Sequence, residues 1–347
     1  MSSSREIEMH EMVIHSRRSP IRTITGVQIA ATGSYLPDEV VRNEDLAALG
    51  FDADWIIQRT GIRERRKAPP EISTSDMAVA AAKRAMEQAG VTGADIDLVI
   101  LGTFTPDLAL PASACLIQDR LGITGPAFDL QAGCAGFIYS MITGMQFVAT
   151  GASKMALIVG ADTNTRAANP ADKKTYPLFG DGAGAVLLSS EGAAEKSVTF
   201  TIGADGSGEQ LLCKKMGGSR IPHSCEGLQD NLHYLQMNGR PVFKWAIRLI
   251  EDTTREVLDH ANLTLDDIDM FFMHQANVRI LDAAASNLGI SKDRVPVNLD
   301  RFGNTSAASI PILLDESVRN DRIKTGDRIM LTGFGAGLAW GTVLLEW

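Results

Sequence analysis

The fold of this chain is indicated first by the stretch Ala94-Asp95-Ile96-Asp97-Leu98-Val99-Ile100, which resembles a later stretch, Leu265-Asp266-Asp267-Ile268-Asp269-Met270-Phe271-Phe272. Both stretches follow a segment with helical periodicity and lead from an aspartate-rich turn into an apolar run of the kind that forms a buried strand. Asp97 and Asp269 are 172 residues apart (269 − 97). This offset predicts that the same turn and strand occur twice in the fold.

A second pair of similar stretches gives almost the same offset. The run Lys154-Met155-Ala156-Leu157-Ile158-Val159-Gly160 resembles Asp327-Arg328-Ile329-Met330-Leu331-Thr332-Gly333, and the final glycines are 173 residues apart (333 − 160). One such similarity between apolar runs is common by chance, whereas two that agree within one residue favour an internal duplication. We therefore predict an α/β fold in which one unit of alternating strands and helices occurs twice.

The length of the chain suits two such units. Its 347 residues exceed the roughly 250 to 300 residues at which a single hydrophobic core stops growing. We predict a flexible polar leader at residues 1–22, an N-terminal half at residues 23–195 and a C-terminal half at residues 196–347.

Two buried helices are expected in the first half. The segment Asp76–Ala89 follows the capping sequence Ser73-Thr74-Ser75, carries alanines at helical spacing and ends before Gly90, so it suits close packing on a sheet. The segment Cys134–Thr150 is apolar on nearly every face, which predicts a helix at the centre of the fold. Cys134 then lies at the N-terminus of that helix.

Charge and composition exclude several function classes. The net charge is −9 and no run of lysine or arginine is long enough to follow a phosphate backbone, which argues against a nucleic-acid partner. The most apolar segment, Phe137–Ala149, is too short to span a bilayer, so no membrane partner is expected. The cysteines form no C-x-x-C pair and no zinc pattern, which predicts reduced thiols and a cytoplasmic location. They are Cys115, Cys134, Cys213 and Cys225.

The first candidate catalytic residue is Cys134, in Ala132-Gly133-Cys134-Ala135-Gly136. A lone cysteine is most often an inert core residue. Here the strand-like run Ala127–Gln131 leads directly into the central helix, so the thiol lies at a turn whose N–H dipoles favour a thiolate. The flanking glycines let a substrate carbonyl approach the backbone closely.

His274 and Asn304 are the other two candidates. His274 ends the apolar run Ile268–Met273, where the strands of α/β sheets present functional groups, although a structural histidine is the simpler alternative. Asn304 is as readily the N-cap of a following helix. Cys134 and Asn304 are 170 residues apart (304 − 134), close to the duplication offset, which places both near the centre of the fold. Together a thiol, an imidazole and a carboxamide can hold an acyl group and stabilise an enolate.

The two glycine-rich runs are not dinucleotide-binding motifs. Gly180–Gly184 and Gly333–Gly337 lack the G-x-G-x-x-G spacing and do not open an N-terminal βαβ unit, so a Rossmann site is rejected. The second run follows a strand, and a backbone N–H there can form an oxyanion hole with the N–H of Cys134.

Taken together, residues 25–347 resemble the β-ketoacyl-acyl-carrier-protein synthase III family of condensing enzymes in the thiolase superfamily. The resemblance implies a homodimer with a five-layered αβαβα fold. It also implies decarboxylative condensation of an acyl-CoA primer with malonyl-acyl-carrier protein to a 3-ketoacyl-acyl-carrier protein, which initiates fatty acid synthesis. Besides the three catalytic segments, it rests on Trp55-Ile56-Ile57-Gln58-Arg59-Thr60-Gly61-Ile62, Phe179-Gly180-Asp181-Gly182-Ala183-Gly184-Ala185, Asp205-Gly206-Ser207-Gly208 and Gly333-Phe334-Gly335-Ala336-Gly337-Leu338-Ala339-Trp340-Gly341.

The same resemblance implies residue roles. Cys134 is the acyl-accepting nucleophile, and His274 and Asn304 bind the thioester oxygen of the malonyl group during decarboxylation. The backbone N–H groups of Cys134 and Ala336 form the oxyanion hole. No metal is implied, and coenzyme A enters as a substrate thioester rather than as a cofactor. The residues expected to contact coenzyme A are Trp55, Arg59, Thr60, Arg166 and Asn277.

Primer choice and carrier-protein docking are expected at two further places. Leu110 precedes the predicted helix Pro111–Leu121, at a position where the resemblance implies a phenylalanine that lines the partner subunit's acyl pocket in many bacterial members. A strict preference for acetyl is therefore not implied, and the length and branching of the primer stay open. The acidic carrier protein is expected to dock on Lys244, Arg248 and Arg279. Lys244 and Arg248 share a helix face, which ordinary solvent exposure explains equally well.

Three alternatives remain. A related enzyme of specialised metabolism can use the same three residues for condensation or acyl transfer. A degradative thiolase is disfavoured, because no second cysteine lies near the C-terminal glycine run. A catalytically silent binding homologue is disfavoured by the intact cysteine, histidine and asparagine.

Overall fold

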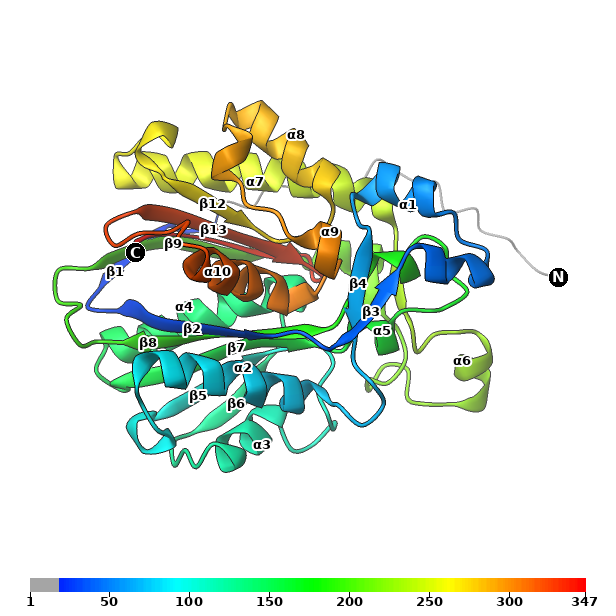
Figure 1. Cartoon of the computed structure of the whole chain (residues 1–347), viewed down its shortest axis with the longest axis horizontal. Helices are drawn as coiled ribbons and strands as arrows, with labels where there is room; N and C mark the ends of the chain where they lie inside the picture. Colours follow the sequence, from blue (N-terminus) through cyan, green and yellow to red (C-terminus); the bar gives the residue numbers. More distant parts are fainter. Residues whose placement is uncertain (1–18) are drawn as a thin grey trace.

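The computed structural model describes residues 19–347 and is built of five layers (Figure 1). Two five-stranded sheets enclose a central layer of helices, α4 (Gly136–Ala149) and α10 (Ser309–Arg319), and other helices cover the outer face of each sheet. This arrangement confirms the predicted αβαβα fold. The outer helices are α2 (Thr74–Ala89) and α3 (Ser113–Arg120) on one sheet, and α7 (Gly239–Ala261) and α8 (Val278–Leu288) on the other.

The two sheets repeat one topology. The N-terminal sheet has the order β2-β8-β7-β5-β6, and the C-terminal sheet has the order β1-β9-β14-β13-β12, so β2-β8-β7-β5 corresponds to β9-β14-β13-β12. The N-terminal sheet consists of β2 (Gln28–Tyr35), β8 (Gly182–Ser189), β7 (Met155–Asp162), β5 (Leu98–Gly102) and β6 (Ala127–Leu130). The C-terminal sheet consists of β1 (Arg22–Thr25), β9 (Ser197–Ala204), β14 (Ala339–Glu346), β13 (Arg328–Gly335) and β12 (Met270–Met273).

The repeated aspartates explain why the sequence similarity is so local. Asp97 accepts a hydrogen bond from the N–H of Lys154 at 2.9 Å, just before β7, and Asp269 accepts one from the N–H of Arg328 at 2.8 Å, at the start of β13. Each carboxylate therefore ties the beginning of one strand to its parallel neighbour. The preceding 3-10 turns, Gly93–Asp95 and Leu265–Asp267, are both closed by a capping box.

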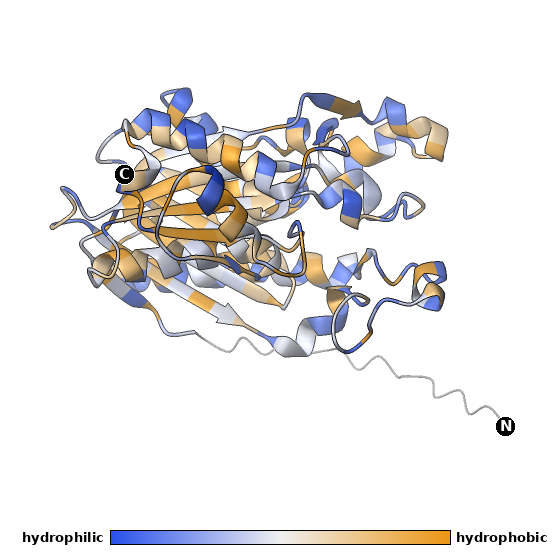
Figure 2. Ribbon diagram, turned by 90° about the horizontal axis from the view of Figure 1, so that it is seen from below, coloured by the Kyte–Doolittle hydropathy of each residue, from blue (hydrophilic) through white to orange (hydrophobic). Residues whose placement is uncertain are grey.

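Close packing places the two predicted helices of the first half as expected. Helix α2 is capped by Ser73 and Asp76 and ends at Gly90, and its alanine stripe lies directly on Gly33 of β2, where any added Cβ meets the α2 backbone. Helix α4 begins after a 3-10 turn at Gly133–Ala135 and is buried between the sheets, because it is apolar nearly all round. Figure 2 shows mostly hydrophobic strands, whereas the outer helices alternate hydrophobic and hydrophilic residues.

Smaller elements complete the fold. The predicted boundary near residue 195 falls in the connection from β8 to β9, and β1, the first strand described, joins the C-terminal sheet. Most of the predicted leader lies outside the described residues. Within residues 19–347, no helix is both long and apolar enough to cross a membrane. The smaller elements are β3 (Glu39–Arg42), α1 (Ala53–Thr60), β4 (Glu64–Lys67), α5 (Asn164–Ala167), β10 (Leu212–Lys214), α6 (Cys225–Gln229), β11 (Leu235–Met237) and α9 (Leu299–Phe302).

Candidate active site

One cavity of about 550 Å³ brings the three candidate catalytic residues together. Cys134 follows β6, His274 follows β12, and Asn304 lies in the turn before α10. All three line the cavity, although they are far apart in the sequence. The turns that follow β6 and β12 and the turn that precedes α10 therefore meet at one cavity.

Cys134 faces the cavity from the turn between β6 and α4. Gly133 allows this turn by adopting φ +53°, a left-handed conformation that side chains disfavour. Burial raises the pKa of the Cys134 thiol to about 12, and the charge of Asp162 adds to this effect. Desolvation of the thiol therefore acts against the N–H dipoles that favour a thiolate.

His274 is a buried, neutral imidazole. Its backbone N–H continues the sheet by donating to Thr332 O at 2.9 Å, and its ring meets Phe334 edge to face at 5.1 Å between centroids. Its Nδ1 lies 2.7 Å from the hydroxyl of Ser309. Burial lowers the pKa of His274 to about 3, so the ring stays uncharged throughout the physiological range.

Asn304 is held by its backbone on both sides. Its N–H donates to Leu178 O at 2.8 Å, and its carbonyl accepts from the N–H of Gly180 at 3.0 Å. Its side-chain Oδ1 accepts from the N–H of Ser306 at 2.8 Å. Asn304 is not the N-cap of the following helix, since Thr305 and Ala308 hold the N-cap positions of the 3-10 turn and of α10, and Asn304 lines the cavity.

The amides of Cys134 and Ala336 lie next to each other across the cavity wall. A Cβ on Gly335 would lie 2.5 Å from Cys134 N, and a Cβ on Gly133 would lie 2.9 Å from Ala336 N. Among the described residues, neither amide donates a backbone hydrogen bond in a turn or loop. Two glycines thus permit a close approach that leaves both N–H groups available to a carbonyl oxygen in the cavity.

Four of the five residues expected to contact coenzyme A line the cavity: Trp55, Arg59, Thr60 and Asn277. The Arg59 guanidinium lies 6.0 Å from the centre of the Trp55 ring. The Asn277 side chain links the two elements at the mouth, since its Nδ2 donates to Arg59 O at 3.0 Å and its Oδ1 caps α8.

Arg166 is the exception, because its side chain is engaged elsewhere in this structure. Its guanidinium donates to the carbonyls of Pro69 and Ile72, both at 2.7 Å, and it is not among the residues lining the cavity. A loop that the sequence could not place supplies these acceptors. The cations that do line the cavity beside Arg59 are Lys174 and Lys214, and sequence reasoning missed both.

The three expected docking cations are exposed on α7 and α8. The guanidinium of Arg279 lies 5.7 Å from the centre of the Phe243 ring, and Phe243 lines the cavity. Lys244 follows Phe243 in α7, and Arg248 lies about one turn further along the same helix.

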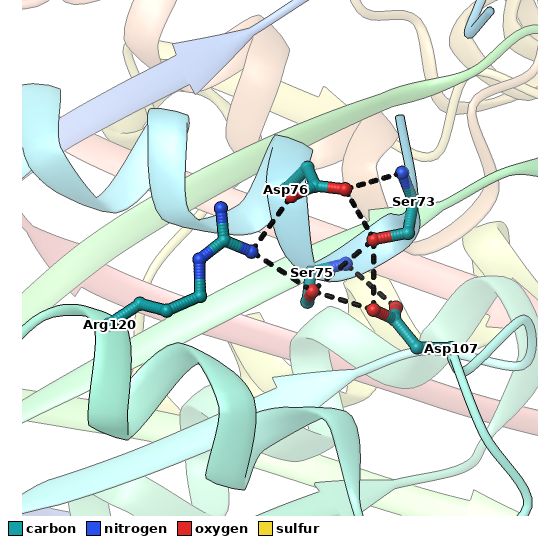
Figure 3. A network of polar contacts seen from close by, with 5 residues as sticks. All are labelled: Ser73, Ser75, Asp76, Asp107 and Arg120. Atoms are coloured by element: carbon teal, nitrogen blue, oxygen red, sulfur yellow. Dashed lines mark hydrogen bonds and ion pairs between the residues drawn. The ribbon is translucent and has the colours of Figure 1, made fainter. Parts of the chain in front are cut away.

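Leu110 is not among the residues lining the cavity, and 86% of its surface is exposed. Its loop is nevertheless firmly anchored by Asp107, whose carboxylate accepts from the N–H of Ser75 at 2.9 Å and from the hydroxyl of Ser73 at 2.9 Å (Figure 3). Arg120 of α3 reaches the same helix start through an ion pair with Asp76 at 2.9 Å. These contacts hold one end of the loop that presents the apolar Leu110 side chain to solvent.

Comparison with known proteins agrees with this geometry. Residues 128–206 match the model of 3-oxoacyl-[acyl-carrier-protein] synthase III, and residues 258–347 match the model of its C-terminal part. The β-ketoacyl-[acyl-carrier-protein] synthase III of Rhodopirellula baltica is 48% identical, covering 93% of this chain and 99% of the relative. That of Desulfitobacterium hafniense is 46% identical, with coverages of 93% and 98%.

Solved structures lead to the same family. The crystal structure of 3-oxoacyl-[acyl-carrier-protein] synthase III from Aquifex aeolicus superposes with a TM-score of 0.85 at 41% identity, covering 92% of this chain and all of that one. The similarity to these relatives extends over nearly the whole chain, and the five layers and the cavity with a cysteine, a histidine and an asparagine agree with it. This chain belongs to the β-ketoacyl-acyl-carrier-protein synthase III family.

Proposed function

We propose that the protein condenses an acyl-CoA primer with malonyl-acyl-carrier protein to give a 3-ketoacyl-acyl-carrier protein, the first condensation of fatty acid synthesis. The observation that carries this proposal is the convergence of Cys134, His274 and Asn304 on one cavity in a chain 48% identical to a named enzyme of this type. The two substrates use the same cavity in turn.

The first half-reaction transfers the primer to Cys134. The sulfur attacks the thioester carbonyl, the bond to the coenzyme A sulfur breaks, and the thiol proton leaves with coenzyme A. The N–H groups of Cys134 and Ala336 would hold the carbonyl oxygen while it carries negative charge. Trp55, Arg59 and Asn277 are proposed to bind coenzyme A at the mouth, and Lys174 is added to this group because it lines the same cavity.

The second half-reaction makes the carbon–carbon bond. The malonyl carboxylate leaves as carbon dioxide, and the released electron pair forms an enolate whose oxygen accepts hydrogen bonds from His274 and Asn304. The enolate carbon attacks the Cys134 thioester, the carbon–sulfur bond breaks, and the sulfur regains a proton from water. A neutral His274 suits this role, because its one ring N–H can donate a hydrogen bond to the enolate oxygen.

Leu110 is proposed to act in a homodimer. An apolar side chain that is 86% exposed on an anchored loop suits insertion into a second copy of the chain, where it would border the acyl pocket. If so, Leu110→Phe should shift primer preference toward acetyl, and Leu110→Ala should shift it toward longer chains. Unchanged preference in both dimeric variants would remove Leu110 from the pocket.

The carrier protein is proposed to dock on the exposed cations Lys244, Arg248 and Arg279. Long-range attraction speeds such encounters and weakens with salt. A cytoplasmic location is also proposed, because the four cysteines are free in the structure.

The test is intact-mass measurement after incubation with a panel of acyl-CoA donors. A mass increase equal to one acyl group, absent from Cys134→Ala, is expected, and the preferred donor identifies the primer. Subsequent malonyl-acyl-carrier protein should discharge the adduct as a 3-ketoacyl product. Adduct formation without this product would indicate acyl transfer alone, and no adduct with any donor would contradict the enzymatic assignment.

A further inference from the structure

Two side chains that donate hydrogen bonds to one oxygen must both present N–H groups to it. A carboxamide can present either oxygen or nitrogen, and a neutral imidazole carries its single proton on either nitrogen. What fixes each choice is the partner on the far side of the side chain.

Asn304 has such a partner. The N–H of Ser306 donates to Oδ1 over 2.8 Å, and a backbone amide can only donate. Oδ1 is therefore the atom turned toward the backbone, and Nδ2 remains for the cavity.

Ser309 provides the corresponding partner for His274. Its Oγ lies 2.7 Å from Nδ1, and both residues are almost fully buried, with exposed fractions of 2% for Ser309 and 1% for His274. Among the described residues, the Ser309 hydroxyl has no other hydrogen-bond partner. A serine that accepted from Nδ1–H would leave its own O–H proton unpaired in a buried site, which is unfavourable.

The hydroxyl therefore donates, and Nδ1 accepts. We propose that Ser309 is a positioning residue that holds His274 in the tautomer with its proton on Nε2, so that Nε2–H is the donor to the malonyl thioester oxygen. This inference rests on the proposed function. It adds that the Ser309 hydroxyl determines which ring nitrogen of His274 donates the hydrogen bond.

This tautomer of His274 should matter for decarboxylation and not for acylation. An Nε2 that already carries a proton cannot accept the Cys134 thiol proton during acylation. Losing the Ser309 hydroxyl should therefore impair decarboxylation and leave acylation nearly unchanged. Ser306 and Ser309 both lie in the turn that leads into α10. The same short segment therefore orients the side chains of Asn304 and His274.

The inference is tested with Ser309→Ala, the conservative Ser309→Thr and a control, Ser317→Ala. Ser317 is also buried on α10, about two turns away. Single-turnover acylation and malonyl decarboxylation are measured separately for each. Ser309→Ala should lower kcat for decarboxylation at least about tenfold with little change in KM, equivalent to losing one hydrogen bond to the imidazole. Ser309→Thr should restore it, and the control should match the wild type.

The tautomer itself is read from long-range ¹H–¹⁵N spectra of ¹⁵N-histidine-labelled wild-type protein, with His274 assigned by its absence in His274→Gln. The Nε2–H pattern is expected. An Nδ1–H pattern in the wild type, or a Ser309→Ala variant with unchanged kcat, overturns the inference even if the wild type condenses both substrates. A wild type that neither acylates nor decarboxylates instead contradicts the proposed function. The wild-type spectrum decides the matter even if Ser309→Ala does not fold.

Discussion

The backbone N–H of Ser306 donates to Oδ1 of Asn304 over 2.8 Å, which leaves the Asn304 amide nitrogen as the group available to the cavity. A substitution that keeps the acceptor and replaces the nitrogen therefore removes only the donor. Asn304→Asp does this, because its carboxylate still accepts from Ser306 N–H but brings a second oxygen where the enolate oxygen would lie.

We expect Asn304→Asp to lower malonyl decarboxylation by about a hundredfold or more, the usual effect of losing one oxyanion donor. Acylation of Cys134 by acyl-CoA should stay within a few-fold of the wild type. Separate assays of carbon dioxide release and adduct mass check both halves. Equal loss in both assays would show that Asn304 does not divide the two steps in this way.

His274 should make folding sensitive to acid. Its pKa is about 3 in the folded protein because of burial, against an ordinary 6.5, so the unfolded chain binds an extra proton between these values. The free energy of unfolding should therefore fall as the pH drops below about 6.5, by up to about 1.4 kcal/mol per pH unit from this residue. Below about 3 its contribution no longer changes.

Denaturant titrations at pH 7.5 and pH 5 check this pH dependence. The difference in free energy of unfolding between wild type and His274→Gln should shift in favour of the variant at the lower pH. Taking this difference cancels the contributions of the other titratable groups, which both proteins share. A constant difference would mean that His274 titrates normally in the folded protein.

The Cys134 thiol should alkylate slowly at neutral pH. Burial raises its pKa to about 12, so the thiolate fraction near pH 7 is very small. Iodoacetamide labelling followed by peptide mass mapping should show Cys134 reacting more slowly than the exposed Cys225, with a rate that keeps rising through pH 9. A rate that levels off near pH 7 would indicate an activated thiolate in the resting enzyme.

Arg59 and Arg166 should respond differently to alanine substitution. Arg59 lines the cavity, so Arg59→Ala should raise KM for acyl-CoA, more at low salt than at high salt. Arg166 donates to the Pro69 and Ile72 carbonyls, so Arg166→Ala should lower thermal stability and leave that KM nearly unchanged. A KM increase of equal size in both variants would instead support the expected contact of Arg166 with coenzyme A.

Asp107 should control the loop that carries Leu110. Asp107→Ala leaves the Ser75 N–H and the Ser75 hydroxyl without their carboxylate acceptor, whereas the Ser73 hydroxyl keeps Asp76, so the protein should be destabilised by about 1 to 3 kcal/mol. If this loop forms the dimer contact, sedimentation should also show weaker dimerisation. The exposed Asp119 on α3 provides the control, since Asp119→Ala removes a carboxylate of the same kind from a neighbouring surface. Matching behaviour of both variants would count against the anchoring role.

Much of the architecture follows from local sequence patterns. The repeated Asp97 and Asp269 mark two turns that tie parallel strands together, and the alanine stripe of α2 fits Gly33 because small side chains permit that distance. Cys134 was predicted at the start of a central helix because that segment is apolar on nearly every face. Periodicity, caps and side-chain size act between near neighbours, so they can be read along the chain.

The site depended on contacts that no local pattern contains. The Arg166 guanidinium is held by the carbonyls of Pro69 and Ile72, about a hundred residues earlier in the chain, and Nδ1 of His274 contacts a hydroxyl 35 residues later. The sequence determined which side chains were chemically able to act. Only the tertiary structure decided which were desolvated, which were already paired and which faced the same cavity, because hydrogen bonds and burial depend on distance in space.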